Sequence, residues 1–270
     1  MTPRELYVHR YPAAHPEGRP TLLFVHGAYS DGRMWMQRFV PWFQAAGFNC
    51  LAPDLSGHGR SAGRDGLDGF GLDDYVDDVA QVVATLDAPP VLIAHSMGTL
   101  VAQRLAERVP LAGMALLAPV PPTGTGGSAS RLALTLPDFF VELPRAIAGS
   151  ADQKTMEVMA RVYFSPEMPP RETVQFLPLM QPESERAVLE MVTLPLRARV
   201  SRRPRLPVLV MGGSQDLVFP ASMLCFTASA WHARQEVVPG AGHMLMLDPQ
   251  WEDAAARLAA WLETLPGTAD

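Results

Sequence analysis

Short apolar runs that alternate with helical patterns are the feature of this sequence that most constrains its fold. The runs lie at 21–25, 48–53, 91–94, 111–118, 206–211 and 236–238. They lack the alternation of a half-exposed strand and are typical of strands buried on both faces of a sheet. Between them, 72–86 places apolar residues at helical spacing, with aspartates in its first turns, where the helix dipole favours negative charge. This alternation predicts an α/β fold, a mostly parallel sheet flanked by helices.

The stretch 120–204 breaks this rhythm. It opens with a Pro- and Gly-rich loop at 119–127 and continues with predicted helices rich in Leu, Met and Phe. We therefore predict a core formed by 1–119 and 205–270, with a helical cap at 120–204 inserted between two core strands. Most of the cap's large apolar residues should be buried and some should face a substrate: Leu132, Leu134, Leu136, Phe139, Phe140, Met156, Met159, Phe176 and Met180.

Composition excludes several classes of partner. The 270 residues carry a net charge of −6, and no basic tract is long enough to follow a phosphate backbone, so nucleic-acid binding is not supported. No apolar run approaches the length of a membrane span, and the charges of Arg4 and Glu5 lie where a signal peptide needs apolar residues. We expect a cytoplasmic protein, and the oligomeric state stays open.

The two cysteines, Cys50 and Cys225, lie far apart in apolar settings. Buried free thiols are the favoured interpretation, although a disulfide stays open. Neither cysteine has the paired spacing of a metal site. Nothing in the sequence indicates a metal, flavin or nucleotide cofactor.

The segment 93–98, Ile-Ala-His-Ser-Met-Gly, lies between a predicted strand and a predicted helix. Small residues at Ala94 and Gly98 allow a sharp turn that exposes Ser96. The amides at the start of the following helix point towards the Ser96 hydroxyl. Acyl transfer by serine needs such an exposed hydroxyl, a base, a group that orients the base, and donors for the oxyanion.

This segment resembles the nucleophile turn of the α/β-hydrolase family, usually written G-x-S-x-G, with Ala94 in place of the first glycine. Three further loops match the family. His26-Gly27-Ala28-Tyr29 follows the first strong strand, and segments 212–216 and 240–243 bring Asp216 and His243 after later strands. The order Ser, Asp, His along the chain also agrees with the family. The resemblance covers about 1–119 and 205–270.

The resemblance implies that Ser96 attacks, that His243 takes and returns the proton, and that Asp216 orients the imidazole. It also implies that the amides of Ala28 and Met97 form the oxyanion hole. The alternative roles are a helix cap for Ser96 and a turn residue for Asp216.

Three further histidines, His26, His58 and His95, could have a role in the site or could simply pack within the fold. His26 and His58 are expected to shape their loops by bonding nearby groups, whereas for His95 lining the pocket and packing stay equally open. A cluster of arginines at 197, 199, 202, 203 and 205 suggests an anionic substrate, such as a coenzyme A thioester, or a solvated return from cap to core.

The sequence thus predicts a cofactor-independent serine hydrolase that acts on an ester, or a thioester, of a small to medium apolar acid. The alternatives are a C–C bond hydrolase or another reaction on the same scaffold, and a binding protein that uses the pocket under the cap. A haloalkane dehalogenase is disfavoured because it needs a carboxylate where this chain has Ser96.

Overall fold

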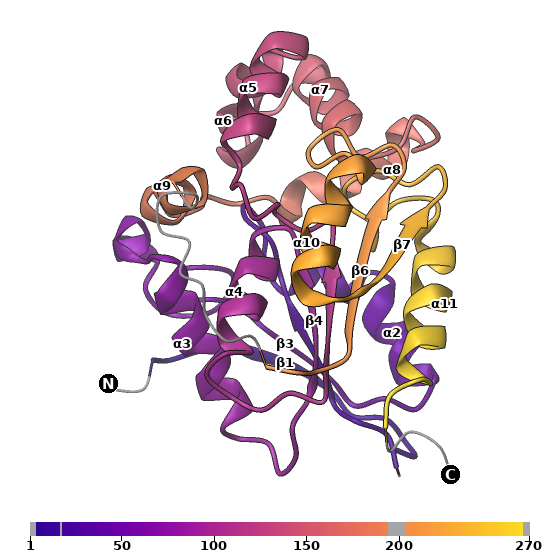
Figure 1. Ribbon diagram of the computed structural model, residues 1–270. Helices are drawn as coiled ribbons and strands as arrows, with labels where there is room; N and C mark the ends of the chain where they lie inside the picture. Colours follow the sequence, from indigo (N-terminus) through magenta and orange to yellow (C-terminus); the bar gives the residue numbers. More distant parts are fainter. Residues whose placement is uncertain (1–3, 17, 194–203, 267–270) are drawn as a thin grey trace.

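A seven-stranded sheet forms the centre of the computed structural model, which describes residues 4–16, 18–193 and 204–266. The strand order is β1-β3-β2-β4-β5-β6-β7 (Figure 1). Only the pairing of β1 with β3 is antiparallel among the described strands. The expected α/β fold with a mostly parallel sheet is confirmed. The strands are β1 (Val8–Tyr11), β2 (Leu22–Val25), β3 (Cys50–Pro53), β4 (Val91–His95), β5 (Gly113–Leu117), β6 (Val208–Gly213) and β7 (Arg234–Val238).

Strand β1 is an addition to the six strands expected from the sequence. It is four residues long, lies at the edge of the sheet and keeps its side chains partly exposed. Its register with β3 runs from Val8 opposite Pro53 to Tyr11 opposite Cys50. A short, half-exposed edge strand has no continuous apolar run, which is why the sequence pattern does not reveal it.

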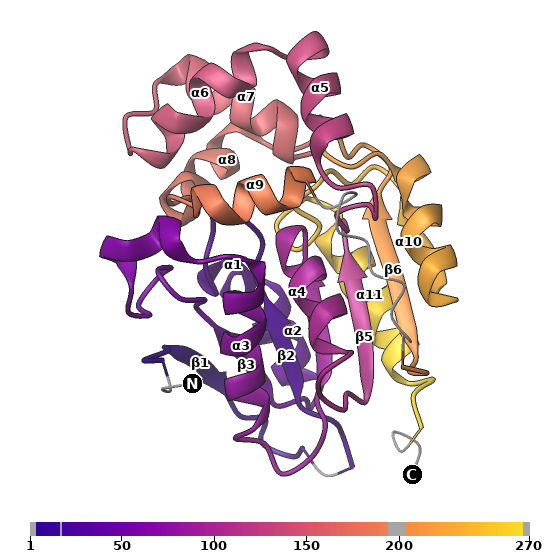
Figure 2. The same cartoon turned by 60° about the vertical axis from the view of Figure 1, so that its left-hand side comes forward.

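Helices cover both faces of the sheet (Figure 2). Helices α1 (Arg33–Met36), α2 (Phe39–Ala45) and α11 (Trp251–Leu262) pack on one face, and α3 (Leu72–Val83), α4 (Met97–Leu105) and α10 (Leu224–Trp231) pack on the other. Short 3-10 turns, η1 (Arg64–Gly69) and η4 (Ala221–Met223), precede α3 and α10 in the chain.

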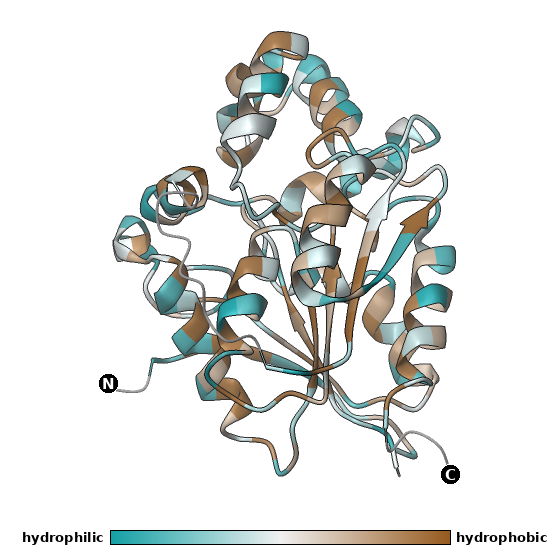
Figure 3. Ribbon diagram, in the orientation of Figure 1, coloured by the Kyte–Doolittle hydropathy of each residue, from teal (hydrophilic) through white to brown (hydrophobic). Residues whose placement is uncertain are grey.

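Strand β2 shows why its sequence is apolar at every position. Leu22 and Phe24 belong to the core on the α2 side, whereas Leu23 and Val25 belong to the core on the α3 side. Figure 3 shows the same pattern across the molecule, with apolar central strands and outer helices striped by hydrophilic residues.

Between β5 and β6 the chain forms a separate group of helices above one end of the sheet (Figures 1 and 2). We call its described residues, 126–193, the cap segment. It contains α5 (Gly126–Thr135), α6 (Asp138–Ile147), α7 (Gln153–Tyr163), α8 (Pro170–Phe176), η2 (Leu177–Leu179) and α9 (Glu185–Thr193). Its small core is formed by Leu132, Phe139, Ala146, Met159 and Val162.

Two apolar residues of the cap segment depart from the expected burial. Leu134 is 86% exposed and Phe140 is 45% exposed, so neither packs into a core. Leu134 lies on α5 and Phe140 lies on α6, and no further layer of described helices covers these two helices from outside. The remaining residues of the expected set are buried or partly buried. The buried ones are Leu132, Phe139, Met159 and Phe176, and the partly buried ones are Leu136, Met156 and Met180.

The expectation for the cysteines was half right. Both thiols are free, and Cys50 is buried in β3, where burial raises the pKa of its thiol to about 12. Cys225 is exposed on α10, so calling it buried was wrong.

None of the described helices is long and apolar enough to cross a bilayer.

Candidate active site

Ser96 sits at the sharp turn between β4 and α4. Its backbone adopts φ 50° and ψ −119°, a conformation that non-glycine residues rarely take and that clusters at functional sites. The Ser96 amide donates to the carbonyl of Leu117 on β5 at 3.0 Å, which holds the turn to the sheet. Gly98 is needed behind it, because a Cβ there would lie 2.5 Å from the His26 carbonyl oxygen.

Ser96, His243 and Asp216 come together from the loops that follow β4, β7 and β6. His243 Nε2 lies 3.2 Å from Ser96 Oγ, and His243 Nδ1 lies 2.9 Å from Asp216 Oδ2. A carboxylate only accepts hydrogen bonds, so Nδ1 carries the proton and Nε2 is left as an acceptor for the serine hydroxyl. His243 and Asp216 are buried, while Ser96 is partly exposed.

Asp216 is oriented by the backbone that follows it. Its Oδ1 accepts from the amides of Val218 at 2.7 Å and Phe219 at 2.8 Å, leaving Oδ2 for His243. The Phe219 ring packs edge-on against the His243 imidazole at 5.5 Å between centroids. Both oxygens of the carboxylate are therefore committed, which fixes the side chain without further charges.

The loop after β2 approaches the serine because β2 and β4 are paired in register. Val25 lies opposite Ala94, so the chain leaves both strands at the same level and Ala28 and Met97 follow on neighbouring loops. A Cβ on Gly27 would lie 3.0 Å from the Cβ of Ser96. Met97 is the first residue of α4, where an amide has no intrahelical acceptor.

His26 shapes this loop, as expected. Its Nδ1 lies 2.9 Å from the Gly27 carbonyl oxygen, and its Nε2 accepts from the Leu55 amide at 3.1 Å. Burial lowers the pKa of His26, which favours the neutral ring that this pattern of one donor and one acceptor requires. The ring thereby links the loops after β2 and β3.

His95 packs behind the serine. Its Nε2 lies 3.1 Å from the carbonyl oxygen of His243, and its ring meets Trp35 edge-on. Burial, together with the nearby His243, places the pKa of His95 well below its usual range. His95 is absent from the lining of the neighbouring cavity, so the packing interpretation applies.

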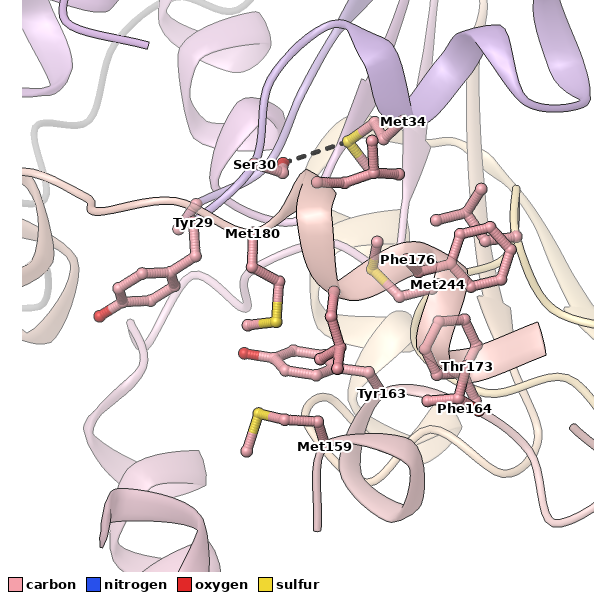
Figure 4. Close-up of a pocket in the computed structure, with 14 residues that line it drawn as sticks. Tyr29, Ser30, Met34, Met159, Tyr163, Phe164, Thr173, Phe176, Met180 and Met244 are labelled. Atoms are coloured by element: carbon pink, nitrogen blue, oxygen red, sulfur yellow. Dashed lines mark hydrogen bonds between the residues drawn. The ribbon is translucent and has the colours of Figure 1, made fainter. Parts of the chain in front are cut away.

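An apolar cavity lies between the cap segment and the loops that follow β2 and β7, and Figure 4 shows side chains that line it. The cavity is open on one side, and the empty space in and around it, open solvent included, is about 520 Å³. Ser96 and His243 do not line it, but Met244, which follows His243 in the chain, and Tyr163, whose ring lies 6.0 Å from that of His243, both do. The lining is Ala28, Tyr29, Ser30, Met34, Met159, Tyr163, Phe164, Thr173, Phe176, Leu177, Leu179, Met180, Met244 and Leu247.

Sequence reasoning found part of this lining. Met159, Phe176 and Met180 were among the cap residues expected to be buried or to face a substrate. Tyr29 and Met244 were not predicted to line a cavity, although Tyr29 belongs to a matched loop and Met244 directly follows another, positions that could have indicated them. Tyr163 and Thr173 carry no comparable signal, because they belong to the cap, where the resemblance gives no guide.

Asp248 joins the cap segment to the loop that carries His243. Its Oδ2 accepts from the amide of Ser165 at 2.7 Å and from the amide of Gly242 at 3.1 Å. The two chains touch directly, because a Cβ on Gly242 would lie 2.5 Å from the carbonyl carbon of Phe164. Burial raises the pKa of Asp248.

Gln181 joins the cap segment to the loop that carries Ala28. Its amide donates to the Tyr29 carbonyl at 3.0 Å, and its side chain donates to Asp31 at 2.7 Å. Its side-chain oxygen accepts from the Gly59 amide at 2.9 Å. This one residue therefore binds the loops after β2 and β3, and only its polarity beside an apolar stretch marks it in the sequence.

Glu183 joins the cap segment to α3 and to the loop after β3. It accepts from the Tyr75 hydroxyl at 2.8 Å and lies 3.2 Å from His58 Nε2. Burial alone would raise the pKa of Glu183, but the charge of His58 and three hydrogen bonds lower it. The other nitrogen of His58 lies 3.1 Å from the Ser56 carbonyl oxygen, in agreement with the loop-shaping role expected of this histidine.

The described residues contain no group of three or more His, Cys, Asp or Glu side chains that could hold a metal ion. Of the arginine cluster, residues 197, 199, 202 and 203 lie outside the described residues. Arg205 is exposed.

A model of the "Alpha/beta hydrolase family" matches residues 22–260. The chain belongs to the alpha/beta hydrolase family. A relative in Mycobacterium tuberculosis, named "Putative non-heme bromoperoxidase BpoC", is 28% identical over 83% of this chain and 86% of its own. The lipase LipV of the same species is 34% identical over 43% of this chain and 42% of its own.

Solved structures agree with this assignment. The crystal structure of the bromoperoxidase-named protein has a TM-score of 0.73 at 23% identity and covers 96% of both chains. A thermophilic esterase from Thermogutta terrifontis, solved with malate bound, has a TM-score of 0.71 at 23% identity and covers 97% of this chain and 95% of its own. These likenesses show that the alpha/beta hydrolase shares its fold with both.

Proposed function

We propose that this alpha/beta hydrolase is a serine hydrolase that cleaves an ester, or a thioester, of a small to medium apolar acid. The observation that carries the proposal is the hydrogen-bonded series Ser96–His243–Asp216, and an apolar cavity lined by Met244, the residue after His243, supports it. Geometry and roles, more than fold, define a serine hydrolase site.

In the first half-reaction, Ser96 Oγ attacks the ester carbonyl carbon while His243 Nε2 takes the hydroxyl proton. Asp216 keeps the ring oriented and stabilises the imidazolium. The amides of Ala28 and Met97 donate to the oxyanion. When the intermediate collapses, the bond to the alcohol oxygen breaks and His243 returns its proton to that oxygen. The acyl group stays on Ser96.

In the second half-reaction, His243 takes a proton from water, and the resulting hydroxide attacks the acyl carbon. The bond to Ser96 Oγ then breaks, the serine regains its proton from His243, and the acid leaves. No outside oxidant, reductant or cofactor is needed for this balance. His243 must be neutral to start each half-reaction, so activity should fall at acidic pH.

Residues 120–204 act as the cap in this proposal. The described part supplies Met159, Tyr163, Thr173, Phe176 and Met180 to the cavity, so it covers the acyl or alcohol group and limits water around it. The lining is dominated by methionine, phenylalanine and leucine side chains, which favours an apolar group in the substrate.

A fluorophosphonate probe tests the proposal, because it forms a covalent bond with an activated serine. We expect labelling of the wild type at Ser96 and hydrolysis of p-nitrophenyl esters. Ser96→Ala should abolish labelling and lower kcat by several orders of magnitude. Ser222→Ala, which changes an exposed serine, serves as the matched control and should behave as the wild type.

The alternatives predict other results. A binding protein would remain unlabelled and turn over no ester while still binding apolar ligands. A C–C bond hydrolase would be labelled at Ser96 but would cleave p-nitrophenyl esters poorly. Labelling that survives Ser96→Ala would place the nucleophile elsewhere.

A further inference from the structure

One polar side chain stands out in the lining of the cavity. Thr173, on α8, is 2% exposed, and its hydroxyl has no hydrogen-bond partner among the described residues. By contrast, the Ser30 hydroxyl in the same lining is satisfied by the Gly27 carbonyl at 2.9 Å. Figure 4 shows Thr173 at the opposite end of the lining side chains from Tyr29.

A threonine in a helix often returns its hydroxyl to the carbonyl four residues earlier. Here the carbonyl of Pro169 accepts from the Thr173 amide at 3.2 Å, and the hydroxyl bonds to no group of the described chain. An unpaired hydroxyl in an apolar setting costs free energy, which valine, with the same shape, would avoid. Because Thr173 belongs to the lining of a cavity, its unpaired hydroxyl points to a partner that arrives with the ligand.

The rest of the lining limits what that partner can be. Phe164, Phe176, Met244 and Leu247 contribute only apolar groups to the cavity. They offer no counter-charge within it, so a charged group on the ligand would remain unpaired there. A neutral oxygen fits, because a threonine hydroxyl can both donate to it and accept from it.

We propose that Thr173 determines specificity by hydrogen-bonding a neutral oxygen in the otherwise apolar part of the substrate. That oxygen belongs to an ether, ketone or hydroxyl group set several atoms from the ester that Ser96 attacks. The inference rests on the proposed serine hydrolase function and narrows its substrates to oxygen-bearing esters.

Thr173→Val tests this directly, because it removes the hydroxyl and keeps the volume. The substrates are p-nitrophenyl hexanoate and analogues with an ether oxygen in place of carbon 4 or carbon 5. A second series varies the alcohol side, with butyl acetate compared with 2-methoxyethyl acetate. For each pair, the quantity measured is the ratio of kcat/KM for the ether to kcat/KM for the alkyl ester.

Thr227→Val is the matched control. Thr227 is 1% exposed and its hydroxyl also lacks a partner among the described residues, but it lies on α10 and does not line the cavity. We expect Thr173→Val to lower the ether-to-alkyl ratio by about threefold to tenfold in at least one pair, the worth of one neutral hydrogen bond. Thr227→Val should leave every ratio unchanged.

The same comparison can be made without turnover. In the Ser96→Ala background the esters bind uncleaved, and calorimetry gives the ratio of their affinities with and without Thr173→Val. If the wild type cleaves esters but Thr173→Val changes both members of every pair equally, the inference is wrong and the serine hydrolase function stands. If no ester is cleaved, the proposed function fails. If Thr173→Val also leaves the ether-to-alkyl affinity ratios unchanged in the Ser96→Ala background, the inference is wrong as well.

Discussion

Asp248→Ala should weaken the junction between the cap segment and the loop that carries His243. The change removes the acceptor for two buried amides, those of Ser165 and Gly242, at 2.7 and 3.1 Å. Leaving a buried donor unsatisfied costs about 1–3 kcal/mol, so the free energy of unfolding should fall by about 2–6 kcal/mol. That is a large share of the ~5–15 kcal/mol that holds a typical protein folded.

Asp248→Asn should behave differently, because its side-chain oxygen can still accept from both amides. Burial raises the pKa of Asp248, so the charged carboxylate is disfavoured in the folded state. The stabilisation from this group is present below its ordinary value of 3.8 and is lost as the pH rises through the folded pKa. Asparagine cannot ionise, so the Asp248→Asn variant does not lose stability in this way as the pH rises. At neutral pH it should match or exceed the wild type in stability, with a difference that shrinks towards pH 4.

Urea unfolding followed by tryptophan fluorescence at pH 7 and pH 4 measures these differences, with kcat and KM determined on the folded variants. Because Gly242 precedes His243, Asp248→Ala should lower kcat more than it raises KM. If asparagine is as harmful as alanine at pH 7, the charge and not the acceptor geometry matters. If alanine changes neither stability nor kcat, the junction contributes nothing and the reasoning fails.

Two further changes probe the site and its contact with the cap segment. Gly98→Ala places a Cβ 2.5 Å from the His26 carbonyl oxygen and should lower kcat at least tenfold. Gly66→Ala is the control, because a Cβ there has no atom within 4 Å, and it should leave kcat unchanged. Equal kcat values for the two variants would contradict the expectation. Glu183→Gln should cost about 1–3 kcal/mol in urea unfolding at pH 7. The pKa of Glu183 is lowered, so its stabilisation is present above the ordinary value of 4.5 and is lost as pH falls through the folded pKa. The cost of Glu183→Gln should disappear in acid, and a cost that persists there would argue against the charge.

Parallel strands made the fold, and the meeting of Ser96, Asp216 and His243, predictable from the sequence. Strands such as β2 are buried on both faces, so their apolar runs are continuous and their ends are sharp. The chemically informative residues follow those ends directly, as Ser96 follows β4 and Asp216 follows β6. The edge strand β1, with half-exposed side chains, lacks this signal and was missed.

The contacts that hold the cap segment on the site had no local signature. Gln181 bonds to Asp31 across 150 positions of sequence, and Asp248 bonds to Ser165 across 83. A single sequence shows that a polar residue interrupts an apolar stretch, but its partner depends on how two distant loops meet. The sequence therefore predicted an inserted helical segment, but the contacts that attach it to the rest of this alpha/beta hydrolase are visible only in three dimensions.

Phe139 and Phe140 illustrate the limit within a single helix. Consecutive residues of an α-helix point about 100° apart, so two adjacent phenylalanines cannot both face one core. Phe139 is 7% exposed and packs with Leu132 and Met159 inside the cap segment, whereas Phe140 is 45% exposed, and neither lines the cavity. The expectation that most of the cap's large apolar residues are buried therefore holds for Phe139 and fails for Phe140. We therefore expect truncation of Phe139 to lower the stability of the cap segment, and we expect selectivity to depend on the side chains that line the cavity from α7 and α8, Thr173 among them.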